Sequence, residues 1–133
     1  MKTTILIFFL TYFNQSFACE CKTYPITNEK SQSELKLEDS FKSSSVIFYG
    51  NYIGDGKFEP IKLYRGKKIL LNRKLIEEKE EKNLCDYFFE KNKKYLVFGE
   101  IDENGKLWTS VCVSNSQIDN KSDLDFVRKY LKK

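Results

Sequence analysis

Histidine is absent from this chain of 133 residues. Its absence removes the usual general base of enzymes, the Ser-His and Cys-His nucleophile pairs, and most catalytic zinc sites. The six glycines are scattered at turn positions, so the chain also lacks a glycine-rich phosphate-binding loop. These absences argue against an enzyme and against a bound cofactor.

Long hydrophobic runs are also scarce, and the single clear one is Ile5–Phe13. It is too short to span a bilayer, and we expect no membrane span later in the chain. Lys2 precedes the run, while Ser16 and Ala18 place small residues at the two positions that a signal peptidase reads. We therefore interpret residues 1–18 as a cleavable signal peptide.

Cleavage after Ala18 would leave residues 19–133 as one small exported domain, secreted or held in the periplasm or at the cell surface. One alternative is a lipid anchor on Cys19, although Ser16 stands where a lipobox usually has leucine. A second alternative is a buried N-terminal helix, but polar Asn14 and Gln15 end the apolar run.

Neither sign of charge dominates the composition. The formal net charge of the whole chain is +4, and it falls by one when Lys2 is removed with the signal peptide. This excess is too mild to argue for nucleic-acid binding, and we interpret the basic clusters as a solvated face, with polyanion binding as the alternative. The clusters are Lys67, Lys68, Arg73 and Lys74, then Lys91, Lys93 and Lys94.

Four cysteines, Cys19, Cys21, Cys85 and Cys112, follow the signal peptide. An even count in a small exported domain predicts two disulfides, whereas the rival zinc site lacks paired CxxC spacing and histidine. In an extended segment the Cα atoms of Cys19 and Cys21 lie roughly 6.6 Å apart, at the limit of disulfide reach. Each is therefore expected to bond to Cys85 or Cys112, with Glu20 facing the opposite side.

Hydrophobic periodicity predicts several short strands and two helices. Gly54-Asp55-Gly56 and Asn104-Gly105 are typical hairpin turns, and Pro60 indicates an edge or bulged strand. Ile76–Asn83 is a charged stretch that we interpret as a solvated loop or short helix. The predicted helices are Asn28–Ser44 and Ser122–Leu131, and the predicted strands are Ser45–Ile53, Phe58–Tyr64, Lys68–Leu75, Lys94–Ile101 and Lys106–Val113.

This pattern predicts a mainly β domain with flanking helices, in which five strands close into a small barrel. A sandwich is the alternative. Leu124, Val127 and Leu131 form an apolar stripe that should dock the last helix on the domain, and Ser122 with Asp125 resembles a capping pair.

Six short segments carry a resemblance to a known family, and they occur in the family's order. The segments are Cys19-Glu20-Cys21, Ser45–Gly50, Leu63–Gly66, Cys85 with Phe88-Phe89, Tyr95–Gly99 and Ser110–Cys112. On these segments the chain resembles the tissue inhibitors of metalloproteinases (TIMP) within the netrin-like (NTR) modules, and is most similar to short bacterial TIMP-like proteins. The resemblance implies a five-stranded OB-like barrel (OB-fold), with Cys19 bonded to Cys85 and Cys21 bonded to Cys112.

The resemblance also implies a function. In the animal inhibitors the amine and carbonyl of the first cysteine chelate the protease zinc, and the residue between the two cysteines enters the specificity pocket. Here these positions are Cys19 and Glu20, and Cys21 completes the partner-binding segment. The implied partner is a zinc metalloprotease or another extracellular protein. Glu20 stands where the animal inhibitors have Ser or Thr, so a structural or adhesive netrin-like domain without inhibitory activity is the alternative.

Overall fold

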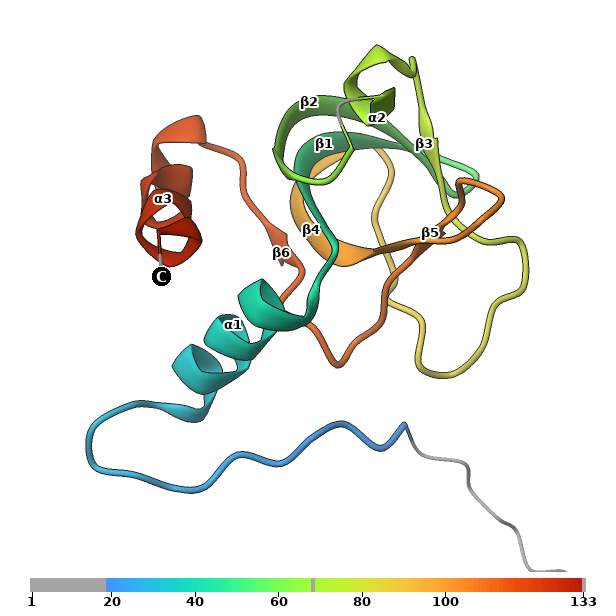
Figure 1. The fold of residues 1–133 in the computed structure, drawn as a ribbon. Coiled ribbons are helices and arrows are strands. Elements are labelled where there is room, and N and C mark those ends of the chain that lie inside the picture. Colours follow the sequence, from blue (N-terminus) through green and yellow to red (C-terminus); the bar gives the residue numbers. More distant parts are fainter. Residues whose placement is uncertain (1–18, 68, 133) are drawn as a thin grey trace, which may run out of the picture.

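The computed structural model describes residues 19–67 and 69–132, so the signal peptide predicted for residues 1–18 lies outside the described part (Figure 1). None of the helices within this part has the length and apolar character that crossing a membrane requires. The helices are α1 (Gln32–Ser43), α2 (Ile69–Asn72), the 3-10 helix η1 (Lys121–Leu124) and α3 (Asp125–Leu131). The strands are β1 (Val46–Gly54), β2 (Lys57–Arg65), β3 (Ile76–Glu77), β4 (Lys93–Ile101), β5 (Leu107–Trp108) and β6 (Ser116–Gln117).

Five of these strands form a nearly closed barrel. Their order is β3-β2-β1-β4-β5, with antiparallel pairing at every step. The two ends of this path meet through a parallel bridge between Glu78 and Leu107, and the Lys79 amide donates to the Leu107 carbonyl at 3.0 Å. Strand β6 pairs with β4 outside this path. The fold is therefore the OB-like barrel that the sequence predicted, mainly β with flanking helices (Figure 1).

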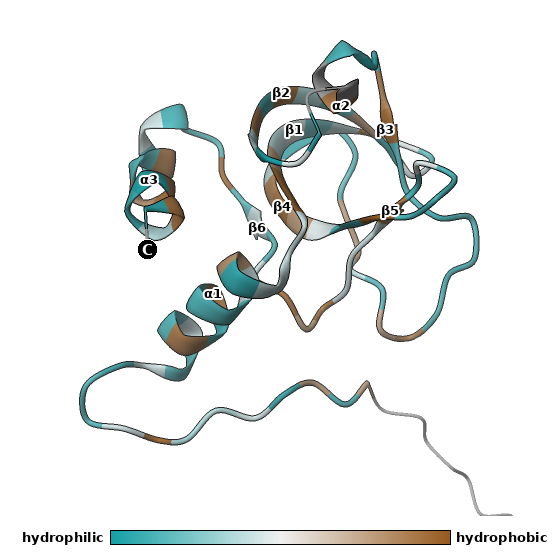
Figure 2. Ribbon diagram, viewed as in Figure 1, coloured by the Kyte–Doolittle hydropathy of each residue, from teal (hydrophilic) through white to brown (hydrophobic). Residues whose placement is uncertain are grey.

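Strand β1 is buried on both faces. Its first five residues, Val46–Gly50, are all buried, and alternate side chains of a strand point to opposite faces. Val46 and Phe48 contribute to the barrel interior, whereas Ile47 and Tyr49 belong to a second core under α1 and α3. Figure 2 shows hydrophobic residues on the barrel strands and on both α1 and α3, among hydrophilic ones. The interior core contains Val46, Phe48, Phe58, Leu70, Ile76, Tyr95, Val97 and Leu107, and the outer core contains Phe41, Ile47, Tyr49, Leu96, Phe98, Ile118, Leu124 and Val127.

Helix α1 begins four residues later than predicted because a capping box sets its start. The Glu34 amide donates to Ser31 Oγ at 3.2 Å, and the Ser31 amide donates to Glu34 Oε2 at 2.8 Å. Near the other end, the Phe41 ring stacks on Tyr130 of α3 with centroids 4.9 Å apart. The two helices therefore pack on each other as well as on the barrel.

The predicted strand Lys68–Leu75 is wrong. This stretch contains the short helix α2, and the third barrel strand is β3, within the stretch interpreted as a solvated loop. A short apolar run fits either structure, and here Leu70 (4% exposed) is needed to pack in the interior core. Ile76 lies opposite Phe58 in the register of the sheet.

The predicted return strand Lys106–Val113 is correct only at Leu107–Trp108. Thr109 lies outside the strand, and its hydroxyl donates to the Phe98 carbonyl at 2.6 Å. The chain then turns toward Cys112.

The expected bulge at Pro60 is confirmed, because the register skips Ile61 between two consecutive pairs of β1 with β2.

The C-terminal helix is present, but its start differs from the prediction. It opens as the 3-10 helix η1, and no side chain caps η1 or α3, so the predicted pairing of Ser122 with Asp125 as a cap is wrong. The predicted stripe is confirmed, because Leu124 and Val127 are buried in the outer core and the partly buried Leu131 packs against it.

Gly99 of β4 lies against the backbone of β5, and this contact predicts that any larger residue at position 99 destabilises the fold. A Cβ at Gly99 would lie 2.3 Å from the Trp108 carbonyl oxygen, which the sheet cannot easily move. We expect Gly99→Ala to lower the free energy of unfolding by about 2 kcal/mol or more. The measurement is urea unfolding of the oxidised protein.

Gly56→Ala is the matched control. Its Cβ would meet no heavy atom closer than 3.5 Å, but Gly56 has φ +69°. We expect only the backbone cost of about 1 kcal/mol there. A loss at Gly99 no larger than the loss at Gly56 would contradict the steric argument.

Candidate functional site: the disulfide-bonded N-terminal segment

Two disulfides attach the N-terminal segment to the barrel. Cys19 is bonded to Cys85 and Cys21 to Cys112, with a Cα–Cα distance of 5.1 Å in each case. These are the pairs that the family resemblance implied. The bonded residues are 66 and 91 positions apart, so each closure stabilises the fold by about 4 kcal/mol in the chain-entropy model.

The loop that carries Cys85 is itself held in place. The Cys85 amide donates to Asn83 Oδ1 at 2.8 Å, and its carbonyl accepts from the Val111 amide at 2.9 Å. Asp86, whose side chain is 8% exposed, pairs with Lys79 Nζ at 3.2 Å. The two cysteine-bearing loops therefore contact each other before either disulfide is counted.

The two disulfides also contact each other. Cys19 Sγ lies 3.7 Å from Cys112 Sγ, and the sulfurs of Cys19, Cys21 and Cys112 lie within 4.8 Å of one another. Because all four cysteines are in disulfides, none offers a thiolate to a metal ion. The sulfur cluster is thus a covalent junction between three segments of the chain.

Glu20 is exposed between the two cross-linked cysteines. Exposed apolar side chains sit beside the partner cysteines in sequence: Leu84 (76% exposed) precedes Cys85, and Val111 (38%) precedes Cys112. Phe88 is 92% exposed in the Cys85 loop. We call Cys19, Glu20, Cys21, Leu84, Phe88 and Val111 the N-terminal edge.

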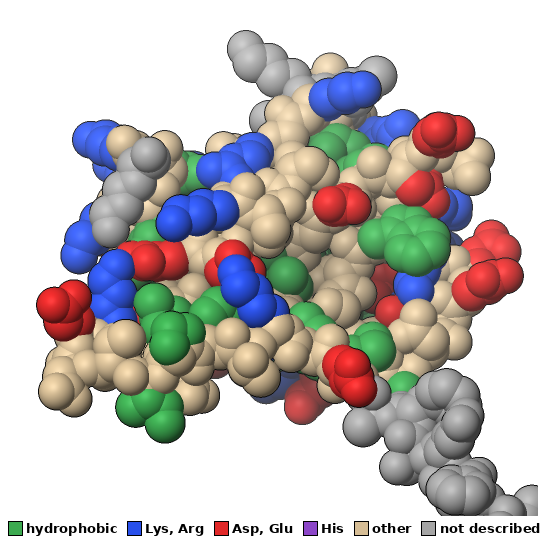
Figure 3. Space-filling view, turned by 60° about the horizontal axis from the view of Figure 1, so that its bottom comes forward, with side chains coloured by type: hydrophobic (Ala, Val, Ile, Leu, Met, Phe, Trp, Pro, Cys, Tyr) green, Lys and Arg blue, Asp and Glu red, His purple; other side chains and the backbone are tan. Residues whose placement is uncertain are grey.

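Figure 3 turns forward the side of the molecule on which the N-terminal segment lies. Hydrophobic side chains emerge there in several places between basic and acidic ones. Single exposed apolar residues are common on protein surfaces, so the notable point is that two of these directly precede the cross-linked Cys85 and Cys112 and the third follows Cys85 in the same loop. An arrangement of this kind can bind a protein surface.

Helix α1 holds the segment that follows the cysteines. Lys22 Nζ pairs with Asp39 Oδ1 at 2.9 Å, and the Tyr24 hydroxyl donates to Asp39 Oδ2 at 3.0 Å. The hydrogen bond from Lys22 holds the pKa of Asp39 below its ordinary value. Lys36 Nζ also donates to the Val111 carbonyl at 2.9 Å, so α1 contacts both sides of the junction.

The structure brings together every residue that the sequence singled out: Cys19, Glu20, Cys21, Cys85 and Cys112. Sequence reasoning missed Leu84 and Val111, although an apolar residue directly before each partner cysteine is a signal that could have been used. It also missed Asp39, because nothing in the sequence links a helix carboxylate to Lys22.

No family model matches this chain, and the comparison with curated proteins also finds no match. Membership of the TIMP-like family therefore stays a prediction that rests on the sequence motifs.

The contact between the two disulfides predicts that a free thiol at Cys112 would exchange with the Cys19–Cys85 disulfide. Cys21→Ser leaves Cys112 as a thiol whose thiolate can attack Cys19 Sγ, forming Cys19–Cys112 and releasing the Cys85 thiolate. We expect both pairings, with more exchange at about pH 8.5 than at about pH 6 because the thiolate is the nucleophile. Non-reducing peptide mapping measures the two populations.

The double variant Cys21→Ser/Cys112→Ser is the control, since it has no thiol and should retain only Cys19–Cys85. Finding Cys19–Cys85 alone in the single variant at both pH values would show that the 3.7 Å contact does not support exchange.

Acid should release the segment from α1. Because the folded-state pKa of Asp39 is depressed, its contribution is present above the ordinary carboxyl pKa and is lost as pH falls through the depressed value. The pKa of Lys22 is raised mainly by its hydrogen bond to Asp39, so that contribution is lost only in strong alkali. We expect the Tyr24 amide resonance to shift with the Asp39 titration in a proton–nitrogen NMR pH series. Asp39→Asn should abolish that transition, and a transition that persists would contradict the assignment.

Proposed function

We propose that this protein is an exported, disulfide-stabilised binding module of the TIMP-like type, whose N-terminal edge binds a zinc metalloprotease. The observation that carries the proposal is the Cys19-Glu20-Cys21 segment, which two disulfides fix to the barrel with Glu20 exposed between them. Disulfides fit an extracellular location. Zinc binding by this segment requires cleavage after Ala18, which would make Cys19 the first residue.

The free terminus would then supply the metal ligands. The α-amine and carbonyl of Cys19 can chelate the zinc of the partner as a five-membered ring, while the protein itself needs no metal. The amine must be neutral to donate its lone pair, and an α-amine titrates near pH ~7.7, so the neutral form is accessible. Fixing Cys19 before binding lowers the conformational entropy lost on association.

The exposed apolar side chains of the N-terminal edge would supply contact area around the zinc. Leu84 and Val111 adjoin the two cross-links, and Phe88 extends from the same loop as Cys85. Aromatic residues near the centre of an interface often dominate its binding energy. Phe88 is therefore the side chain of the edge on which we expect affinity to depend most.

Glu20 restricts which proteases can bind. Moving an unpaired carboxylate into an apolar specificity pocket costs several kcal/mol, so a suitable pocket must offer a cation. We expect weak or no inhibition of common matrix-type proteases. The same charge favours the second candidate function, a structural or adhesive netrin-like domain that inhibits no protease.

A lipid anchor at Cys19 conflicts with this bonding pattern. A thioether to lipid would occupy the sulfur that is bonded to Cys85. The lipidated and doubly cross-linked forms therefore exclude each other, and intact-mass analysis of the exported protein separates them. We propose the cross-linked form, secreted or retained in the periplasm or at the cell surface.

The zinc-chelating mechanism predicts that one added residue abolishes inhibition. An alanine placed before Cys19 moves the amine by about 3.5 Å and acylates the original nitrogen. Wild type, the extended form and Glu20→Thr are titrated against a panel of zinc proteases. We expect Glu20→Thr to inhibit better than wild type and the extended form to be inactive.

Glu29→Thr is the matched control, because Glu29 is also exposed but lies outside the N-terminal edge. It should behave like wild type. Inhibition that survives the alanine extension would show that the chelation mechanism is wrong. If neither wild type nor Glu20→Thr inhibits any protease of the panel, the structural or adhesive function is favoured.

A further inference from the structure

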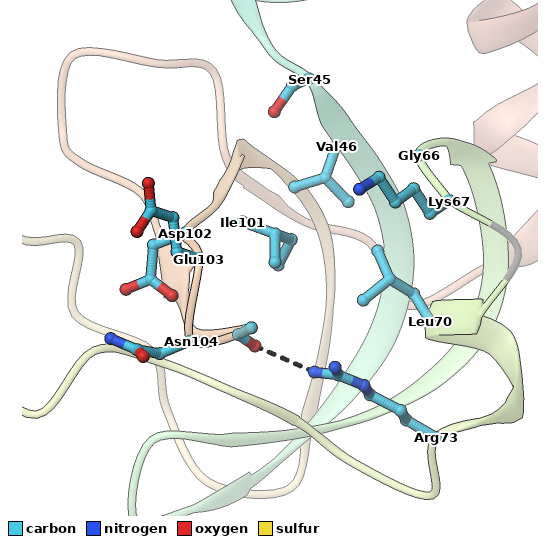
Figure 4. Close-up of a pocket in the computed structure, with 11 residues that line it drawn as sticks. Ser45, Val46, Gly66, Lys67, Leu70, Arg73, Ile101, Asp102, Glu103 and Asn104 are labelled. Atoms are coloured by element: carbon cyan, nitrogen blue, oxygen red, sulfur yellow. Dashed lines mark hydrogen bonds between the residues drawn. The ribbon is translucent and has the colours of Figure 1, made fainter.

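A cavity of about 500 Å³ opens at the end of the barrel where β1 begins and β2 and β4 end. It lies between α2 and the connection from β4 to β5, and its lining includes no residue of the N-terminal edge (Figure 4). Its volume is in the range of small-molecule binding sites. Nothing in the proposed function uses it.

The floor of the cavity is aliphatic. Figure 4 shows the side chains of Val46, Leu70 and Ile101 converging from three different elements. Val46 and Leu70 are 1% and 4% exposed and belong to the interior core, so packing holds both side chains in place. Such a floor favours an apolar group of a ligand over water.

Charged groups line opposite sides of this floor. Lys67 reaches across the cavity near Val46, and Arg73 extends along the lower side, while the carboxylates of Asp102 and Glu103 lie on the other side (Figure 4). An anion in the cavity would therefore be drawn to the side of Lys67 and Arg73.

The hydrogen bonds of the charged side chains show which of these groups remain free to bind a ligand. Both carboxylate oxygens of Asp102 already accept, one from the Lys106 amide at 2.8 Å and one from Trp108 Nε1 at 2.9 Å. Arg73 uses Nη1 for the Gly105 carbonyl at 3.1 Å and keeps further donors. Lys67 is exposed and makes no side-chain hydrogen bond or ion pair within residues 19–67 and 69–132. Donors therefore remain for a ligand at Lys67 and Arg73, while on the acidic side the Glu103 carboxylate makes no hydrogen bond or ion pair within residues 19–67 and 69–132, so an anion would have to bind on the side away from Glu103.

We propose that this cavity binds a small carboxylate that carries an aliphatic group. The carboxylate would bond to Lys67 and the spare donors of Arg73, and the aliphatic group would lie on Val46, Leu70 and Ile101. Two sources share this chemistry, a free fatty acid and the C-terminus of a polypeptide that ends in an aliphatic residue. The proposal is independent of protease binding.

The chain contains a reporter for this site. Trp108 is its only tryptophan, and its indole N–H is bonded to Asp102, which lines the cavity. Octanoate and N-acetyl-leucine are titrated against the labelled protein while the indole and backbone resonances are followed by NMR. The neutral amides of both compounds serve as matched ligands.

We expect the acids to bind about tenfold more tightly than their amides, because each charge-assisted hydrogen bond is stronger than a neutral one. Lys67→Gln should remove most of this difference and Lys67→Arg should retain it. Lys129→Gln changes the net charge equally on exposed α3 and should behave like wild type. The spectra also report whether each variant is folded.

Binding of octanoate alone assigns the site to fatty acids, binding of N-acetyl-leucine alone assigns it to polypeptide termini, and binding of both supports the shared chemistry. The proposal is overturned if neither acid binds, if acids and amides bind equally, or if folded Lys67→Gln keeps the preference for acids.

Discussion

The structure depends on the burial of β1 on both of its faces. This strand pairs with β2 on one side and β4 on the other, and its alternate residues enter two separate cores. Phe48 packs edge-on to Phe58 inside the barrel, while Ile47 lies under the helices. A one-residue slip of β1 would exchange these two sets of side chains, so the register of the whole barrel is tightly specified.

The barrel also determines where the two disulfides attach the N-terminal segment. Cys85 lies between β3 and β4, and Cys112 follows β5, so the two loops come from strands that the sheet has already arranged. The contact from the Val111 amide to the Cys85 carbonyl brings the loops together without help from sulfur. The disulfides therefore add Cys19 and Cys21 to a preformed surface, and the position of Glu20 follows from the fold.

The sequence was sufficient where a pattern had one physical solution. The long strands and the glycine turns were predicted correctly, because β1 and β4 are rich in β-branched and aromatic residues, which favour strands. The sequence was insufficient around Leu70, where a short apolar run predicted as a strand is a helix that packs Leu70 in the interior core. The sequence prediction also failed after Trp108, where the strand ends and the chain turns toward the disulfide-bonded Cys112. The residues of the site could be named from cysteine spacing, but the contact of Asp39 with the N-terminal segment and the exposure of Phe88 emerge only from the three-dimensional structure.

The N-terminal edge and the cavity are different kinds of candidate site, and the fold explains how one chain can present both. The edge is exposed at Glu20 and is attached to the barrel through the two disulfides. The cavity is concave and formed by strand ends, so its aliphatic floor is part of the core itself. The segment from β4 to Cys112 joins them, since Asp102 lines the cavity and bonds to Trp108, four residues before Cys112. A movement of this segment would change the geometry of both the cavity and the edge. The pairing of Glu100 with Trp108 and the contact of Gly99 with the Trp108 backbone resist such a movement. Rigidity between the two sites, rather than coupling, is the consequence of that close strand packing.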